Sequence, residues 1–505
     1  MAATSRTAKS LKNSTVALTM YFVNLVLQFF SRKIFLDYLG TEILGLNTTA
    51  TNLLQFLNLA ELGVWSAVAT TLYKPLADKN HKDICRIITF NGIIYKRIAT
   101  LIILASLVLM CFFPLIFKKM ELPLWYAYAS FGILLFGSLL SYFVNYRQFL
   151  LTADQKNYKV QYTYKLSMAI KLIFQIIAVK YFQDPYIWWL LLEMLFAIAG
   201  SIVLNRIILK TYPFLVDTKE TFKDLSKDYP EIIINIKRLF VQKISSYVLF
   251  QTSPLIIYGL SNLYLVTLYG NYMLIINGLI SLMAAMFDGM LASIGNLVAS
   301  TSKEYSIEIF KQLYSLRFMV IAVISYCTLI FGQQFIELWL GVNYLLGKST
   351  LAILVATFAV YVNRYVIYDY LSAYGYFGDV WASVAEVVLN IGLSVVLGIR
   401  YGLNGVLTGV LISLIIISML WKPFFLFKIK LKTKFTNYIK FASFHILSGG
   451  ALFAGAYMLN TLFRHMNLPS IVAGILSSSI YAATFGLLLY KNCIPFRNAV
   501  RRFKR

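Results

Sequence analysis

The sequence contains few charged residues, few prolines and only four cysteines. Charged residues make up 13% of the 505 positions. Soluble domains carry about 25%, so an ordinary soluble protein is excluded. Ten prolines and 27 glycines are too few for a collagen-like or disordered chain. The cysteines are scattered and the three histidines form no cluster, so no disulfide framework, metal centre or other cofactor is predicted.

Apolar residues, in contrast, make up 59% of the chain. The runs 97–117 and 471–490 each match the roughly 20 residues that a helix needs to cross a bilayer. Similar runs recur along the whole chain, which predicts an all-α polytopic membrane protein with about fourteen transmembrane helices. The predicted spans are 14–37, 44–70, 97–117, 122–146, 158–181, 186–208, 239–260, 264–294, 317–340, 350–375, 380–399, 405–427, 441–462 and 469–490.

The net charge of +25 is spread unevenly along the chain. With both termini in the cytoplasm, the basic segments 206–243, 422–440 and 491–505 fall on the inner side, as the positive-inside rule requires. This distribution favours a topology signal and contacts with anionic membrane lipids over nucleic-acid binding. The basic start of the chain runs into an apolar stretch without a cleavage site, which indicates an uncleaved first helix.

The polar stretch 150–158 interrupts the apolar sequence, and 370–380 repeats its pattern. Together with weaker matches in the same order, this predicts two six-helix repeats, helices 1–6 and 7–12. An even number of helices in each repeat gives both repeats the same orientation in the membrane. Each repeat then forms one lobe, and we expect the substrate path to lie between the two lobes. The predicted organisation is an N-lobe at 1–210, a cytoplasmic interlobe linker at 211–235, a C-lobe at 236–428, helices 13 and 14 at 429–490 and a basic cytoplasmic tail at 491–505.

Polar residues recur at helical spacing within several predicted spans, and lipid cannot satisfy them, so we expect them to face protein or water. Two cations stand out, Lys171 in the fifth span and Arg364 in the tenth. A charge near the bilayer centre costs about 2.5–3.5 kcal/mol on insertion scales, which suggests that each binds substrate in a central cavity. The other residues predicted to line that cavity are Asn24, Gln28, Arg32, Gln175, Tyr368 and Asn390.

Each of the two cations could instead have a structural role without binding substrate. Arg364 could snorkel to the inner membrane face, and Lys171 could form an ion pair with a carboxylate. Glu61, Asp288 and Glu386 are the acids considered as partners or as sites of ion coupling, whereas the shallower Glu193 is interpreted as structural.

Pro254 is the one proline away from the ends of a predicted span, because the other nine lie in loops or at span ends. A proline there removes a backbone hydrogen bond and kinks the helix. We therefore predict a hinge in helix 7.

No Walker A sequence occurs and the predicted outer loops are short, so neither a built-in ATPase nor a membrane glycosyltransferase is favoured. The chain is predicted not to be an enzyme.

Several segments resemble bacterial polysaccharide transporters, the flippases for lipid-linked repeat units of O-antigen, capsule and exopolysaccharide. Residues 31–80 resemble the start of these proteins, "RQFLLTADQKNY" (147–158) is similar to a signature of the family, and "ELWLGVNYLL" (337–346) and "RYGLNGVLTGVLIS" (400–413) to its later motifs. The resemblance extends over nearly the whole chain. It implies the multidrug/oligosaccharidyl-lipid/polysaccharide (MOP) exporter superfamily, whose fold is two six-helix bundles around a V-shaped cavity.

The resemblance implies a monomeric flippase of the bacterial cytoplasmic membrane that moves polyprenyl-diphosphate-linked oligosaccharides by alternating access. Lys171 and Arg364 would then match the cationic cavity common in this family. A polysaccharide polymerase and assembly proteins are further candidate partners. The alternatives are a cation-coupled multidrug antiporter of the same fold, a flippase of the peptidoglycan precursor and, less favoured, a membrane glycosyltransferase.

Overall fold

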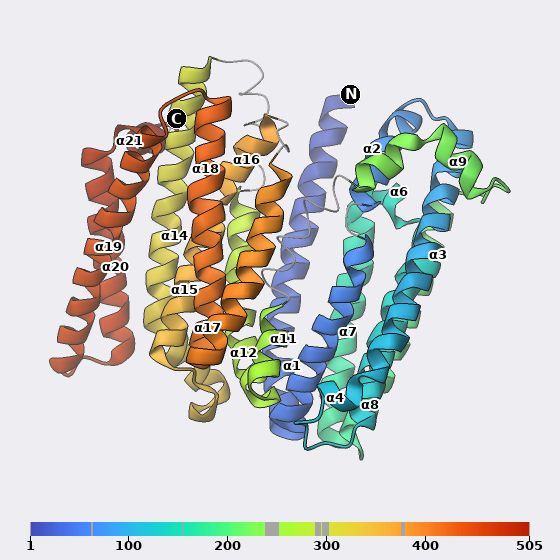
Figure 1. Ribbon diagram of the computed structural model, residues 1–505, viewed down its shortest axis with the longest axis horizontal. Helices are drawn as coiled ribbons and strands as arrows, with labels where there is room; N and C mark the ends of the chain where they lie inside the picture. Colours follow the sequence, from blue (N-terminus) through green and yellow to red (C-terminus); the bar gives the residue numbers. More distant parts are fainter. Residues whose placement is uncertain are drawn as a thin grey trace. The chain divides into compact units, whose positions relative to one another are not determined.

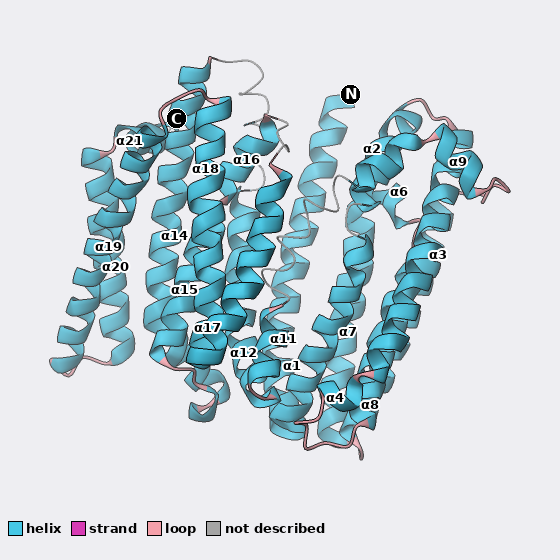
Figure 2. Cartoon of the chain, viewed as in Figure 1, coloured by secondary structure: helices cyan, strands magenta, loops and turns pink. Residues whose placement is uncertain are grey.

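The computed structural model describes residues 2–61, 64–154, 156–237, 252–287, 294, 302–374 and 379–503. Within these ranges all regular secondary structure is helical (Figure 2). Ten of the described helices are long and apolar enough to cross a membrane. The prediction of an all-α polytopic membrane protein is therefore confirmed.

The chain forms two compact units, Met1–Thr267 and Leu268–Arg505, and each is described by itself. The first unit contains the described helices that precede residue 268 (Figure 1). They are α1 (Ala2–Leu57), a 3₁₀ turn (Asn58–Glu61), α2 (Val64–Ala77), α3 (His81–Cys111), α4 (Phe113–Ile116), α5 (Trp125–Phe143), α6 (Gln148–Ala153), α7 (Asn157–Tyr181), α8 (Pro185–Thr211), α9 (Phe222–Asp228), α11 (Ser253–Leu260) and the start of α12 (Leu263–Phe287).

The second unit contains most of α12 and all of the helices that follow it. They are α14 (Lys303–Leu340), a 3₁₀ turn (Val342–Tyr344), α15 (Lys348–Asn363), α16 (Tyr365–Ala373), α17 (Val380–Leu414), a π-helix (Ile415–Trp421), α18 (Lys422–Phe425), a second π-helix (Leu426–Lys430), α19 (Phe435–His465), α20 (Ser470–Asn492) and α21 (Ile494–Phe503).

Two of the long helices are divided by a glycine in a left-handed conformation. Gly40 in α1 has φ 82°, and Gly402 in α17 has φ 58°, where side chains with a Cβ are disfavoured. Each glycine falls between two predicted spans. In α17 the two arms pack against each other, because Ser394 Oγ donates to the carbonyl of Val406 across the bend at 3.0 Å. A Cβ on Gly405 would lie 2.0 Å from the carbonyl oxygen of Leu397, so the close approach requires glycine.

Pro254 lies in the first turn of α11. Proline suits this position because the amide there lacks an intrahelical partner. The predicted helix 7 begins at 239, and its first part lies outside the described residues, so the kink stays a prediction. α11 packs on α1 within the first unit, and the division between the units falls inside α12.

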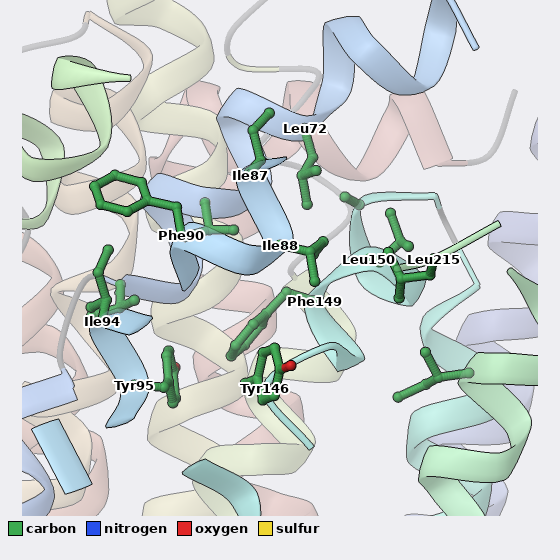
Figure 3. Packing of buried hydrophobic residues seen from close by; sticks show 14 of the residues in the cluster. Leu72, Ile87, Ile88, Phe90, Ile94, Tyr95, Tyr146, Phe149, Leu150 and Leu215 are labelled. Atoms are coloured by element: carbon green, nitrogen blue, oxygen red, sulfur yellow. The ribbon is translucent and has the colours of Figure 1, made fainter. Parts of the chain in front are cut away.

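The core of the first unit includes a segment that the sequence suggested would be a linker. Leu215 and Leu225 are buried with Ile88, Phe90 and Leu150 in one apolar cluster (Figure 3). The cluster joins α2, α3, α6 and the end of α8 to the chain that follows α8. The first part of the predicted linker 211–235 is therefore a packed part of the unit.

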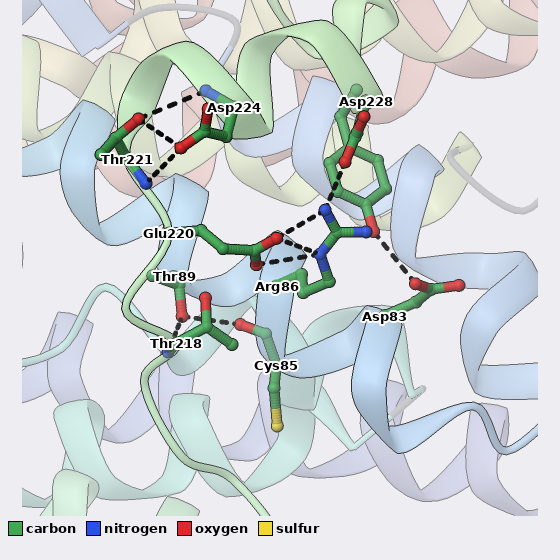
Figure 4. Close-up of polar contacts among 10 residues, drawn as sticks. Asp83, Cys85, Arg86, Thr89, Thr218, Glu220, Thr221, Asp224 and Asp228 are labelled. Atoms are coloured by element: carbon green, nitrogen blue, oxygen red, sulfur yellow. Dashed lines mark hydrogen bonds and ion pairs between the residues drawn. The ribbon is translucent and has the colours of Figure 1, made fainter.

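Ion pairs fasten the same segment to α3 (Figure 4). The guanidinium of Arg86 donates through Nε to both carboxylate oxygens of Glu220 at 2.9 Å, and its Nη2 pairs with Asp228. Thr221 and Asp224 form a capping box at the start of α9. The hydrogen bonds from Arg86 hold the pKa of the Glu220 carboxyl below its usual value, and those with Thr221 do the same for Asp224.

The polar interruption at 150–158 lies between α5 and α7 and includes most of α6. One of its polar groups and the neighbouring Arg147 also bind the segment after α8. Arg147 Nη2 lies 2.6 Å from Asp217, and the hydroxyl of Tyr212 donates to Asp154 at 2.8 Å. The stretch 147–158, which resembles the transporter signature, thus holds the segment after α8 in place within the first unit.

The last three helices pack against α14. A Cβ on Gly474 of α20 would lie 2.6 Å from the ring of Phe331, so a small residue is needed at this contact. In α21, Phe496 and Ala499 are buried, and Asn498 donates to Glu308 of α14 at 3.3 Å. The described part of the predicted basic tail is therefore a docked amphipathic helix.

Candidate functional site

Lys171 lies on α7 and forms an ion pair with Glu193 on α8. The ammonium nitrogen is 2.5 Å from Oε1 of Glu193, and Gln175, one turn further along α7, donates to Oε2 at 3.0 Å. Gln175 also donates to the carbonyl of Trp189 at 3.2 Å. The partner of Lys171 is thus Glu193, which the sequence analysis interpreted as structural, and not one of the three acids it considered.

This pair borders a cavity of about 360 Å³ between α5, α7 and α8. Its wall is polar at several points, because Asn145, Tyr164 and Ser201 also line it. Asn145 donates to Ser201 at 3.0 Å and to the Tyr164 hydroxyl at 3.4 Å. The cavity therefore contains hydroxyl and amide groups together with a cation whose charge is balanced by Glu193.

In the second unit, Arg364 lies at the junction of α15 and α16 and is 3% exposed. Its Nη1 is 3.6 Å from the carboxylate of Glu386, which is 1% exposed. The guanidinium also lies over the rings of Tyr361 and Tyr368, 4.0 and 5.2 Å from their centroids. At 3.6 Å the ion pair is longer than a hydrogen bond, and Arg364 Nη1 has no hydrogen-bond partner among the described residues.

Arg364 belongs to a larger charged network. Ser418 donates to Glu386 at 3.1 Å and lies 3.4 Å from the Tyr368 hydroxyl. Lys422 binds Asp379 at 2.8 Å, and both are buried. Ser418 sits in the π-helix Ile415–Trp421, an irregularity that is frequent at functional sites.

The position of Lys422 corrects the sequence analysis. The sequence predicts that the basic segment 422–440, which begins with Lys422, contacts lipid headgroups, but the side chain of Lys422 is buried in an ion pair with Asp379. The sequence does contain an indication that Lys422 is buried, because it is the one charged residue in the predicted span 405–427.

A second missed pair lies nearby. Arg317, which is 2% exposed, donates to Asp369 at 2.8 Å and lies over the ring of Phe287. Its place at the start of the predicted span 317–340 gave no signal for this contact.

The remaining candidates lie in different places. In α1, Asn24 donates to the carbonyl of Lys165 at 3.1 Å, Arg32 donates to the carbonyl of Thr267 at 3.4 Å, and Gln28 is half-buried. Glu61 interacts with the hydroxyl of Tyr142. Asn390 is fully buried and donates to Ser413 at 3.4 Å. Asp288 lies outside the described residues.

The structure therefore brings the candidates together in two groups. Lys171 and Gln175 meet at Glu193 in the first unit, and Arg364, Tyr368 and Glu386 meet in the second. Each group combines a cation, an acid and hydrogen-bonding side chains inside membrane-spanning helices. Such groups are costly in lipid, which makes both of them candidates for a functional site.

No protein-family model and no curated protein sequence matches the chain. Solved structures do match it over most of its length. A structure described as "Lipid II flippase MurJ, inward closed conformation" is 19% identical, covers 95% of this chain and 100% of its own, and has a TM-score of 0.65. An inward-facing multidrug resistance MATE family transporter of the MOP superfamily is 13% identical, covers 81% and 97%, and has a TM-score of 0.59.

The chain has the fold of the MurJ and MATE transporters. A further MATE structure, in a bent conformation, gives a TM-score of 0.50 at 12% identity, over 82% of this chain and 94% of its own. The MOP-type fold expected from the resemblance is thus confirmed.

Proposed function

We propose that the protein is a flippase that moves polyprenyl-diphosphate-linked oligosaccharide repeat units across the cytoplasmic membrane. The observation that carries this proposal is the buried guanidinium of Arg364, which keeps an unused donor beside two tyrosine rings. A guanidinium matches the geometry of a phosphate group. Aromatic, amide and hydroxyl groups near each cation can replace the hydration of sugars.

The proposal gives the acids a second role. Glu386 and Glu193 keep their cations neutralised when no substrate is bound, which lowers the cost of burying a charge. A diphosphate would compete with these carboxylates for the cations. Glu61, Asp288 and Glu386 remain the proposed sites of ion coupling, and alternating access would come from rocking of two lobes.

The direct test is transport by purified protein in liposomes, with a fluorescent lipid-linked oligosaccharide added to one leaflet. We expect movement to the other leaflet, and loss of movement in Arg364→Ala at equal reconstitution. Arg364→Lys should retain an intermediate rate, because an ammonium keeps the charge but loses the bidentate geometry. Equal rates in wild type and Arg364→Ala would remove Arg364 from the substrate path.

The similarity to a lipid II flippase over 95% of the chain favours one second candidate, transport of the peptidoglycan precursor. Expression in a strain depleted of its own precursor flippase distinguishes the two. Restored growth would favour the precursor, whereas restored surface polysaccharide in a strain without its repeat-unit flippase would favour the first proposal. Efflux of cationic drugs without either rescue would favour a multidrug antiporter.

A further inference from the structure

Two cavities in the second unit lie next to each other and are lined in part by the same residues. The apolar cavity, of about 610 Å³, lies between α14, α15, α19 and α20, with Val355 and Ile446 among its lining residues. The second cavity, of about 640 Å³, lies between the end of α14, the start of α15 and the end of α19. Leu329, Ala352 and Phe453 line both. We call the two cavities together the groove and the second cavity its mouth.

The groove is open to the surroundings of the membrane-spanning helices. Leu420 and Ile446 in the apolar cavity are 47% and 54% exposed, and Met458 in the mouth is 69% exposed. Exposed apolar side chains on membrane-spanning helices are suited to contact with hydrocarbon. A lipid chain can therefore enter the apolar cavity from the side.

The mouth carries charge. Lys348 is the first residue of α15, Arg464 lies in the last turn of α19, and Glu337 lies in the last turn of α14. Both cations are exposed, and in the described part of the chain no carboxylate lies within ion-pair distance of either. Two cations and one carboxylate leave the mouth with an excess of one positive charge.

The mouth also offers an unused acceptor. The side-chain oxygen of Gln334 is buried and has no hydrogen-bond partner among the described residues. The neighbouring Gln333 is already used, because it donates to the carbonyl of Leu346 at 2.8 Å. A buried acceptor without a partner costs free energy, and a hydroxyl or ammonium of a ligand would satisfy it.

We propose that the groove binds a glycerophospholipid. One acyl chain lies in the apolar cavity, and the phosphodiester lies at Lys348 and Arg464. The single negative charge of a phosphodiester matches the excess charge of the mouth. Gln334 accepts a hydrogen bond from the polar headgroup, and Glu337 limits the mouth to a headgroup of low net negative charge.

Size and charge both favour this lipid over a polyprenyl diphosphate. Taking a methylene group as about the size of a water molecule, about 30 Å³, a cavity of about 610 Å³ holds roughly twenty of them. That volume is close to the volume of one acyl chain, whereas a long polyprenyl chain would extend out of the cavity into the membrane. A diphosphate also carries more negative charge than the mouth neutralises. The bound lipid is thus distinct from the proposed substrate, and the inference does not depend on the proposed function.

The test measures lipid that stays with the full-length protein. The protein is purified in a mild detergent and examined by native mass spectrometry, and its extracted lipids are then identified. We expect about one glycerophospholipid per chain. The double variant Lys348→Ala/Arg464→Ala should lose at least several-fold of this lipid. Ala352→Trp should lose it as well, because Ala352 lines both cavities and an indole there would take up space in each.

Arg400→Ala is the matched control. Arg400 is exposed, belongs to the same unit and lines neither cavity, so its loss should leave lipid retention unchanged. Equal gel-filtration profiles would show that all variants fold. Unchanged retention in both the double variant and Ala352→Trp would overturn the proposal. Retention of polyprenyl phosphate in place of a glycerophospholipid, lost in the double variant, would also overturn it.

Discussion

The guanidinium of Arg364 lies 3.6 Å from the carboxylate of Glu386, and neither side chain is more than 3% exposed. The two residues come from different helical segments, the junction after α15 and the first arm of α17. Burying both charges is costly unless they compensate each other. The pair therefore has a structural role whether or not Arg364 also binds substrate.

The first prediction separates these two roles. Arg364→Ala leaves Glu386 buried without its cation and should destabilise the protein by about 3–5 kcal/mol. Arg364→Met/Glu386→Gln removes both charges and should recover much of this stability. Thermal unfolding in detergent measures both effects. If the double variant is stable and does not transport, Arg364 or Glu386 acts on the substrate or the coupling ion. If it is stable and fully active, the pair is structural only.

The second prediction concerns Lys171 and Glu193. The exchange Lys171→Glu/Glu193→Lys preserves a pair but moves the cation to α8. We expect near-normal expression, because the attraction is retained, and reduced transport if Lys171 faces the diphosphate. Lys171→Arg should keep substantial transport, whereas Lys171→Ala and Lys171→Glu should fail progressively. Surface glycan in a strain without the chromosomal copy measures transport, and blotting measures protein level. Full activity of Lys171→Ala would make the residue structural.

The third prediction concerns pH. Arg86 lowers the pKa of Glu220 from its ordinary value of 4.5. A carboxylate whose pKa is lower in the folded state contributes stability above its unfolded pKa, and this is lost as the pH falls through the folded value. Amide exchange of residues 212–229 should therefore be slow at pH 7 and speed up, after correction for intrinsic rates, below about pH 4.5. Glu220→Gln should speed it several-fold at pH 7, whereas Lys219→Gln should not. Equal protection in Glu220→Gln would show that the apolar contacts suffice.

The fourth prediction is the topology. Reporter fusions after residues 119, 183 and 466 should lie outside, and those after 80, 220, 435 and 505 should lie inside, because the basic segments stay in the cytoplasm. The two ends of the second unit differ accordingly, with α21 inside and the mouth of the groove outside. An outside C-terminus would contradict the fourteen-span topology.

The fifth prediction concerns Pro254. If Pro254 fixes a working bend before α11, Pro254→Ala should leave expression intact and slow transport, because the helix can then continue through this position. Pro123→Ala is a suitable comparison, since Pro123 precedes α5 outside the helix. Unchanged transport in Pro254→Ala would limit the residue to packing in the first turn of α11.

The sequence by itself determined the class of protein and most span positions. Runs of about 20 apolar residues match the length that crosses a bilayer, and in lipid a helix satisfies its backbone hydrogen bonds within one segment. The predicted span boundaries also lie on either side of Gly40 and Gly402, and the structure shows that each break occurs at the glycine. The sequence also identified Lys171 and Arg364 as unusual, because an isolated charge in a span is costly at any rotation of the helix.

Only the tertiary structure decided which group meets which. Lys171 pairs with Glu193, and Lys422 pairs with Asp379. Helical periodicity gives the face on which a residue lies, but the rotation and depth of the neighbouring helix determine its partner. The packing of 212–229 against α3 depended likewise on contacts distant in sequence, such as Arg86 with Glu220. Composition could suggest a charged linker there, but only the folded unit places a partner opposite each charge.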